Sequence, residues 1–162
     1  MGFIVTPSAP AGTDYQWTFI ESNDFAVNVT FTTQDLSSYD EVLIDIDISG
    51  AGTNLELTFD AVTSGYEANY RAGSGSQSNT TGASYIHFGS DAVATFGGLT
   101  GYFLVSKNAN SSTVFNVSCA SNLNTNYLIN GTLNGTVYTT ITLDLQALDH
   151  TGKANVYGRV RL

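Results

Sequence analysis

Alternation of apolar and polar residues is the dominant pattern along this chain, and it is clearest between Val42 and Ile48. The even positions there are all Val or Ile, and two of the odd positions are acidic. A two-residue repeat is typical of a β-strand with one buried and one exposed face. The pattern predicts a core face made of Val42, Ile44, Ile46 and Ile48, and a polar face that carries Asp45 and Asp47.

The same alternation recurs along the chain, whereas a helical repeat is almost absent. Further strands are predicted within residues 15–22, 25–33, 54–62, 85–89, 101–107, 113–120, 137–148 and 154–162. The glycines between residues 48 and 55 predict a hairpin that joins the strand of Asp45 to the next one. Residues 71–84 are polar and glycine-rich, and they predict a long loop.

Short strands separated by turn residues predict an all-β fold, an antiparallel β-sandwich of the jelly-roll-like type. No repeat or domain boundary interrupts them. We expect one β-sandwich domain over residues 15–162, preceded by an extended arm over residues 1–14, which contain both prolines.

Composition narrows the classes of partner. Of the 162 residues 42% are hydrophobic and only 12% are charged, about half the usual charged share. The surface is therefore expected to consist of Ser, Thr, Asn and Gly. A net charge of −9 disfavours nucleic acid, which requires a basic patch. No apolar run approaches the ~20 residues of a membrane helix, and the first residues lack the pattern of a secretion signal. We expect neither a nucleic-acid nor a membrane partner.

Residues suited to catalysis or metal binding are scarce. The chain has two histidines, His87 and His150, and one cysteine, Cys119. His87 is expected on a strand, His150 in a turn and Cys119 in the core. Neither a nucleophile motif nor zinc or EF-hand spacing occurs. We therefore expect no enzymatic activity, no metal and no cofactor.

The acidic pair Asp45 and Asp47 has three interpretations. A divalent ion could bridge these carboxylates to the acidic residues of the predicted hairpin partner. Arg159 or Arg161, which share one face of the last predicted strand, could pair with them. A solvated or interfacial polar face is the third and favoured interpretation, and it predicts that Asp45→Asn combined with Asp47→Asn leaves the fold intact.

Tyrosines flank the predicted polar loop. Tyr66, Tyr70 and Tyr85 are candidate stacking platforms for a host-surface glycan, as in a carbohydrate-binding module. Packing in the core or in an interface is the favoured interpretation, because tyrosine suits a half-buried strand.

The order of several short motifs resembles a family of bacteriophage virion proteins, which occur as tail-fibre or spike heads and as stand-alone particle proteins. A tryptophan strand is followed by a Leu-Ser-Ser-Tyr-Asp segment that leads into an apolar strand, and then by a leucine-rich strand and a tyrosine loop. An Ile-rich strand, a glycine turn and a Tyr-Gly strand end the order. The corresponding residues are Trp17, Leu36 to Asp40, Leu55 to Phe59, Tyr66, Tyr70, Ile141, Gly152, Tyr157 and Gly158.

The resemblance implies a jelly-roll-like, non-enzymatic subunit on the particle surface (virion localisation), usually a homotrimer. One domain plus a short arm, without a fibre shaft, favours a capsid decoration (cement) protein that binds the major capsid protein. A receptor-binding tail-fibre or spike head is the alternative, and a carbohydrate-binding module is the second alternative.

Overall fold

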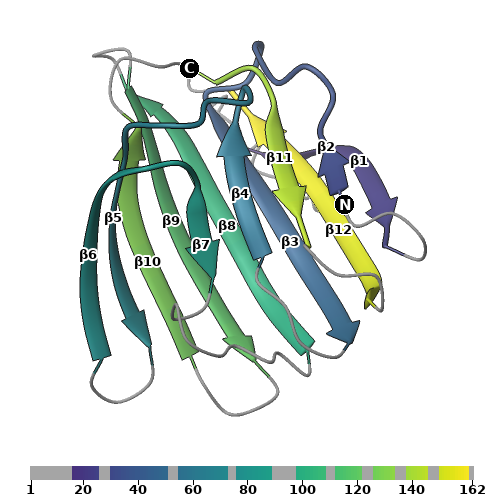
Figure 1. Ribbon diagram of the computed structural model, residues 1–162. Helices are drawn as coiled ribbons and strands as arrows, with labels where there is room; N and C mark the ends of the chain where they lie inside the picture. The colour runs from purple at the N-terminus through teal and green to yellow at the C-terminus, as the bar shows by residue number, and fades with distance from the viewer. Residues whose placement is uncertain are drawn as a thin grey trace, which may run out of the picture.

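Two antiparallel sheets form the computed structural model of the chain (Figure 1). The structure describes residues 16–25, 30–50, 55–72, 76–88, 98–108, 112–121, 126–133, 138–145 and 150–160. These residues contain no helix, and therefore none that could cross a membrane. The prediction of an all-β, antiparallel β-sandwich is confirmed, while the jelly-roll-like connectivity stays a prediction.

The larger sheet has eight strands, and neighbours in space are often distant in sequence. Their spatial order is β1 (Thr18–Asp24), β12 (His150–Arg159), β3 (Glu41–Gly50), β8 (Gly98–Asn108), β9 (Ser112–Ser121), β10 (Asn126–Leu133), β5 (Tyr66–Ala72) and β6 (Ser76–Ala83).

The smaller sheet has four strands and lies in front of the larger one in Figure 1. Its order is β2 (Thr30–Thr32), β11 (Ile141–Asp144), β4 (Leu55–Phe59) and β7 (Ile86–Phe88).

The core lies between the sheets and takes alternate residues from each. In the larger sheet the four predicted positions of β3, Val42 to Ile48, are at most 4% exposed, and in the smaller sheet Leu55, Leu57 and Phe59 are at most 1% exposed. Phe59 is the centre of an aromatic cluster, with ring centroids 5.6 to 6.1 Å from those of Tyr66, Phe115 and Tyr138. Such tilted and stacked pairs add to the burial of apolar area in holding the sheets together.

The predicted hairpin between the strand of Asp45 and the next strand is wrong. β3 belongs to the larger sheet, where it pairs with β12 and β8, and β4 belongs to the smaller sheet. Both strands turn alternate residues toward the same core, so their sequence patterns fit a hairpin and a change of sheet equally well.

Two smaller predictions also differ from the structure. The polar stretch 71–84 is largely strand, because β5 and β6 form an antiparallel pair at the edge of the larger sheet. His150 begins β12 opposite Gly50 and is not in a turn. His87 lies on β7, as predicted. The predicted arm (residues 1–14) and Arg161 lie outside the described residues.

Candidate functional site

The outer face of β3 carries the acidic pair that the sequence singled out. Asp45 and Asp47 are exposed, whereas their neighbours Ile44 and Ile46 are fully buried. The predicted division of this strand into a core face and a polar face is confirmed.

The surroundings of the acidic pair decide between its interpretations. Asp45 lies opposite Asn155 of β12 and Tyr102 of β8. Asp47 lies opposite Lys153 and Thr100, and its carboxylate accepts a hydrogen bond of 3.0 Å from the Thr100 hydroxyl. The cross-strand neighbours of Asp47 are polar, and Asp45 lies between Asn155 and Tyr102, which fits a solvated or interfacial face.

The described residues of the chain do not support the two other interpretations of the acidic pair, pairing with arginine and binding of a divalent ion. Arg159 lies opposite Glu41 and pairs with that residue, so it does not pair with Asp45 or Asp47 within the chain. Arg161 lies outside the described residues, and pairing between subunits stays a prediction. The acidic residues Glu56 and Asp60 lie in or next to β4 of the smaller sheet, so they are not cross-strand neighbours of Asp45 and Asp47. Among the described residues, no group of three or more His, Cys, Asp or Glu could hold a metal ion.

A row of apolar side chains runs beside the acidic pair across four strands. It consists of Phe19 on β1, Tyr157 on β12, Leu43 on β3 and Leu104 on β8, each directly opposite the next. We call these four residues the apolar row. Phe19 is 56% exposed and the other three are half-buried. The Phe19 and Tyr157 rings meet edge to face, with centroids 5.7 Å apart.

Tyr102 extends this surface toward Asp45. It is 47% exposed and lies on β8, two residues before Leu104 on the same face of the sheet. Tyr102 and Leu104 are surface residues that were not among the predicted site residues. The sequence pattern that could have identified them is their alternation with Phe103 and Val105, which are fully buried.

Toward β5 and β6 the same outer face of the large sheet carries exposed amides. Asn130 of β10 lies opposite Asn69 of β5, which lies opposite Asn79 of β6, and all three are exposed. The outer face thus has an apolar part on β1, β12, β3 and β8, and an amide-bearing part on β10, β5 and β6.

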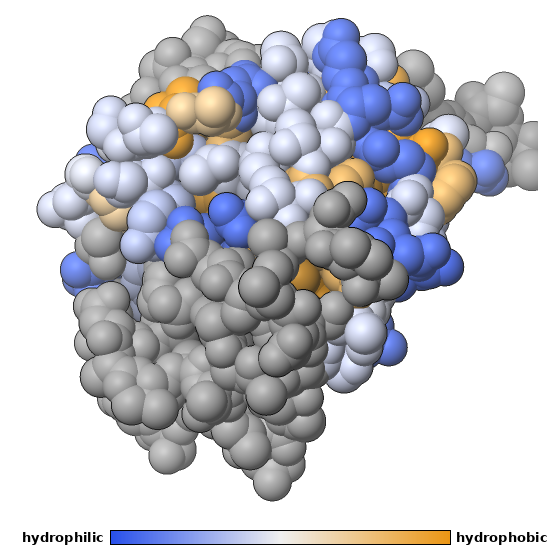
Figure 2. Space-filling view, turned by 45° about the vertical axis from the view of Figure 1, so that its right-hand side comes forward, coloured by the Kyte–Doolittle hydropathy of each residue, from blue (hydrophilic) through white to orange (hydrophobic). Residues whose placement is uncertain are grey.

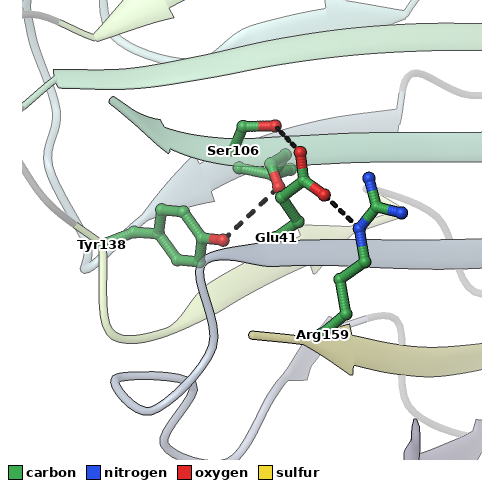
Figure 3. A network of polar contacts seen from close by, with 5 residues as sticks. Glu41, Ser106, Tyr138 and Arg159 are labelled. Atoms are coloured by element: carbon green, nitrogen blue, oxygen red, sulfur yellow. Dashed lines mark hydrogen bonds and ion pairs between the residues drawn. The ribbon is translucent and has the colours of Figure 1, made fainter. Parts of the chain in front are cut away.

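A largely buried ion pair joins three strands in the row next to the apolar row (Figure 3). Glu41 of β3 is 6% exposed; its carboxylate accepts hydrogen bonds from Arg159 Nε of β12 and, at 3.3 Å, from Ser106 Oγ of β8. The Arg159 guanidinium also lies 4.7 Å from the centre of the Trp17 ring, a cation–π distance. These contacts fix the segment before β1 against β12 and β3.

A second cation, Lys107, lies beside the buried Tyr138 at the edge of the core. Lys107 Nζ donates to the carbonyl oxygens of Leu36 and Ser37, at 3.1 and 2.9 Å, and lies 5.1 Å from the centre of the Tyr138 ring. Partial burial lowers the pKa of Lys107 from its ordinary value. The buried Tyr138 hydroxyl donates to the Val105 carbonyl at 3.5 Å. Both networks hold strands and loops in place, which is a structural role.

The three tyrosines proposed as glycan platforms do not form one exposed group. Tyr66 is fully buried; its hydroxyl accepts a hydrogen bond from the Phe59 backbone N–H at 2.8 Å and donates one to the Val62 carbonyl at 3.0 Å. The interpretation of Tyr66 as an exposed platform is therefore wrong, and the favoured interpretation, core packing, is confirmed for this residue. Tyr70 is half-buried and packs against the core, and Tyr85 is half-buried between β6 and β7.

Comparisons of the chain with protein families, with curated proteins and with solved structures found no match.

Proposed function

We propose that this chain is a structural protein of a bacteriophage particle surface, and specifically a capsid decoration protein that docks on the head and stabilises it. The observation that carries the proposal is the apolar row together with Tyr102. The proposal includes a homotrimeric, jelly-roll-like subunit bound to the major capsid protein.

The apolar row is expected to be covered by a binding partner. One face of an antiparallel sheet can remain in water when its outward residues are polar. Here four neighbouring strands place apolar side chains side by side on the outer face. Contiguous exposed apolar groups of this kind are typical of protein–protein interaction sites.

The remaining surface suits a protein displayed on a particle. Only 12% of the residues are charged, so Ser, Thr, Asn and Gly must supply much of the polar surface. On the face shown in Figure 2, apolar residues form small separate groups among pale and blue residues. Together with the order of motifs from Trp17 to Gly158, these features support a role in assembly.

A receptor-binding tail-fibre or spike head is the second candidate. The exposed amides of Asn130, Asn69 and Asn79 favour it, because they lie on adjoining strands and can donate and accept hydrogen bonds to a polar ligand such as a host-surface glycan. This candidate predicts few copies per particle and binding to host cells.

Copy number separates the two candidates. Quantitative mass spectrometry of purified particles should find hundreds of copies of a decoration protein and a handful of a tail protein. Particles that lack the chain should lose infectivity at a lower temperature than complete particles, and adding purified protein should restore their resistance. Absence of the chain from particles, or equal heat resistance with and without it, would overturn the decoration role.

A further inference from the structure

We propose that the apolar row, Tyr102 and the adjoining Asp45 and Asp47 form the docking surface, and that the covering partner is a protein surface with an apolar patch flanked by Lys or Arg side chains. The inference rests on the proposed function and names the surface and the chemistry of the partner. We call these seven residues the docking face: Phe19, Leu43, Asp45, Asp47, Tyr102, Leu104 and Tyr157.

The geometry of the sheet makes these side chains one continuous surface. Neighbouring strands lie about 4.8 Å apart, so the four members of the apolar row extend over roughly 15 Å. Tyr102 and Asp45 lie directly opposite each other in the next row. An apolar centre with a polar border is the usual arrangement of a protein interface.

The carboxylates beside the row exceed the cations available to neutralise them. Within the part of the chain that the structure describes, Asp45 has no hydrogen-bond or ion-pair partner. Asp47 accepts one hydrogen bond, from Thr100. Lys153, opposite Asp47, lies 3.4 Å from a carboxylate oxygen of Asp24 on its other side. The acidic border therefore complements a basic partner.

A second copy of the chain is a poor occupant of the docking face. In a two-fold contact the same patch meets itself, so each copy would offer the same acidic border. The chain has five Lys and Arg residues against 14 Asp and Glu. Of those five, Arg159 is bound to Glu41 and Lys107 to backbone carbonyls. Any contacts within the proposed trimer are thus assigned to other surfaces.

Binding to particles tests the docking face directly. Purified protein is titrated onto particles of the source phage that lack the chain, and the bound fraction is measured at low and high salt. Phe19→Ser with Tyr102→Ser alters the two most exposed apolar residues of the docking face. This double variant should weaken binding by at least about tenfold, because aromatic residues buried in an interface dominate its energy. Asp45→Lys with Asp47→Lys should weaken it at least as much.

Control variants lie on the same outer face of the sheet, on the strands β10 and β5 outside the docking face. Leu128 of β10 is 44% exposed, so Leu128→Ser removes an apolar side chain of similar exposure outside the docking face. Glu67 of β5 is exposed, so Glu67→Lys reverses one charge outside the docking face, where the docking-face variant reverses two. Both controls should bind as the wild type does. Salt should weaken wild-type binding but have little effect on Asp45→Asn with Asp47→Asn, because screening acts on the charge pairs.

The outcomes separate the inference from the proposed function. Wild-type protein that fails to bind the particles contradicts the proposed function itself. Wild-type binding that survives both docking-face double variants overturns the inference alone. Light scattering of each folded variant completes the test: an unchanged oligomeric state supports an external partner, and dissociation of the oligomer in the double variants shows that the face joins copies of this chain.

Discussion

Asp60 joins two segments that are about 80 residues apart in the sequence. It follows β4 in a left-handed conformation, with φ of 49°, and precedes Ala61 at 55°. Its carboxylate accepts hydrogen bonds from the backbone N–H groups of Thr139 and Thr140, at 2.8 and 2.6 Å, and from both threonine hydroxyls. One side chain thus fixes the turn that leads into β11.

The pKa of Asp60 gives this contact a pH signature. Desolvation alone would raise it, but the hydrogen bonds from Thr140 and Thr139 hold it below its ordinary value. The stabilisation is therefore fully present above the unfolded pKa of about 3.9 and is lost as pH falls through the folded pKa. We predict that Asp60→Asn lowers the free energy of unfolding by about 2 kcal/mol at pH 7.

Urea unfolding of the wild type and Asp60→Asn at pH 7, 5, 4 and 3 checks this prediction. The difference between the two proteins should be constant down to about pH 5 and then shrink. A difference that does not change with pH would show that the charge of Asp60 is irrelevant to the contact.

Tyr66 offers a second test at the residue scale. Its hydroxyl is the partner of the buried Phe59 N–H, so Tyr66→Phe leaves a buried donor unsatisfied. We expect a loss of about 1–3 kcal/mol in the free energy of unfolding. The control Tyr102→Phe, at a side chain that is 47% exposed, should change it by less than about 0.5 kcal/mol. Equal effects in urea unfolding would count against the buried role of Tyr66.

The burial of Tyr66 agrees with the residue pattern of its strand. Tyr66, Ala68 and Tyr70 alternate with Glu67 and Asn69, which is the pattern of a half-buried strand. This alternation supports the favoured interpretation, core packing, whereas the exposed platform rested only on the place of Tyr66 beside a glycine-rich stretch. The alternation of β3 and β4 was strong enough to identify their buried residues correctly.

The Glu41–Arg159 pair acts at the scale of elements, because it joins β3 and β12 and holds Trp17 beside them. Replacing Arg159 by methionine keeps the length of the side chain but leaves the carboxylate of Glu41, a residue that is 6% exposed, without its cation. We expect a loss of about 3 kcal/mol in the free energy of unfolding. The exposed Arg71→Met is the matched control.

A double variant separates lost charge pairing from lost packing. Glu41→Met with Arg159→Met should be more stable than Arg159→Met alone, since no buried charge remains unpaired. Thermal and urea unfolding of the wild type, Arg159→Met, the double variant and the control Arg71→Met measures the difference. If the double variant is the least stable, the carboxylate of Glu41 has other supports that matter more than Arg159.

The arrangement of the strands was less predictable from the sequence than their buried faces. Alternation identifies which residues of a strand are buried, but β3 and β4 bury residues in the same core from opposite sheets. β6 was missed for a different reason. It is an edge strand rich in Ser, Asn and Thr, so it lacks the apolar alternation, and its pairing with β5 is visible only in the structure.

At the scale of the whole molecule, the net charge of −9 keeps copies of the protein apart, whereas the apolar row favours contact between them. Net charge keeps proteins apart in solution, and this repulsion vanishes near the isoelectric point, which is about 4.2 here. Near that pH little net charge is left to keep the apolar rows, and with them the docking faces, of two copies apart. We therefore predict that the protein associates between pH 5 and 4 through this face.

Light scattering during acidification, with circular dichroism to confirm that the protein stays folded, tests this prediction. Phe19→Ser with Tyr102→Ser should suppress the association, whereas Leu128→Ser should not. Asp45→Asn with Asp47→Asn should shift its onset to higher pH, because two of the charges that oppose it are absent throughout. If the Phe19 and Tyr102 double variant associates as strongly as the Leu128 variant, acid-induced association is a property of the whole low-charge surface and does not report on the apolar row.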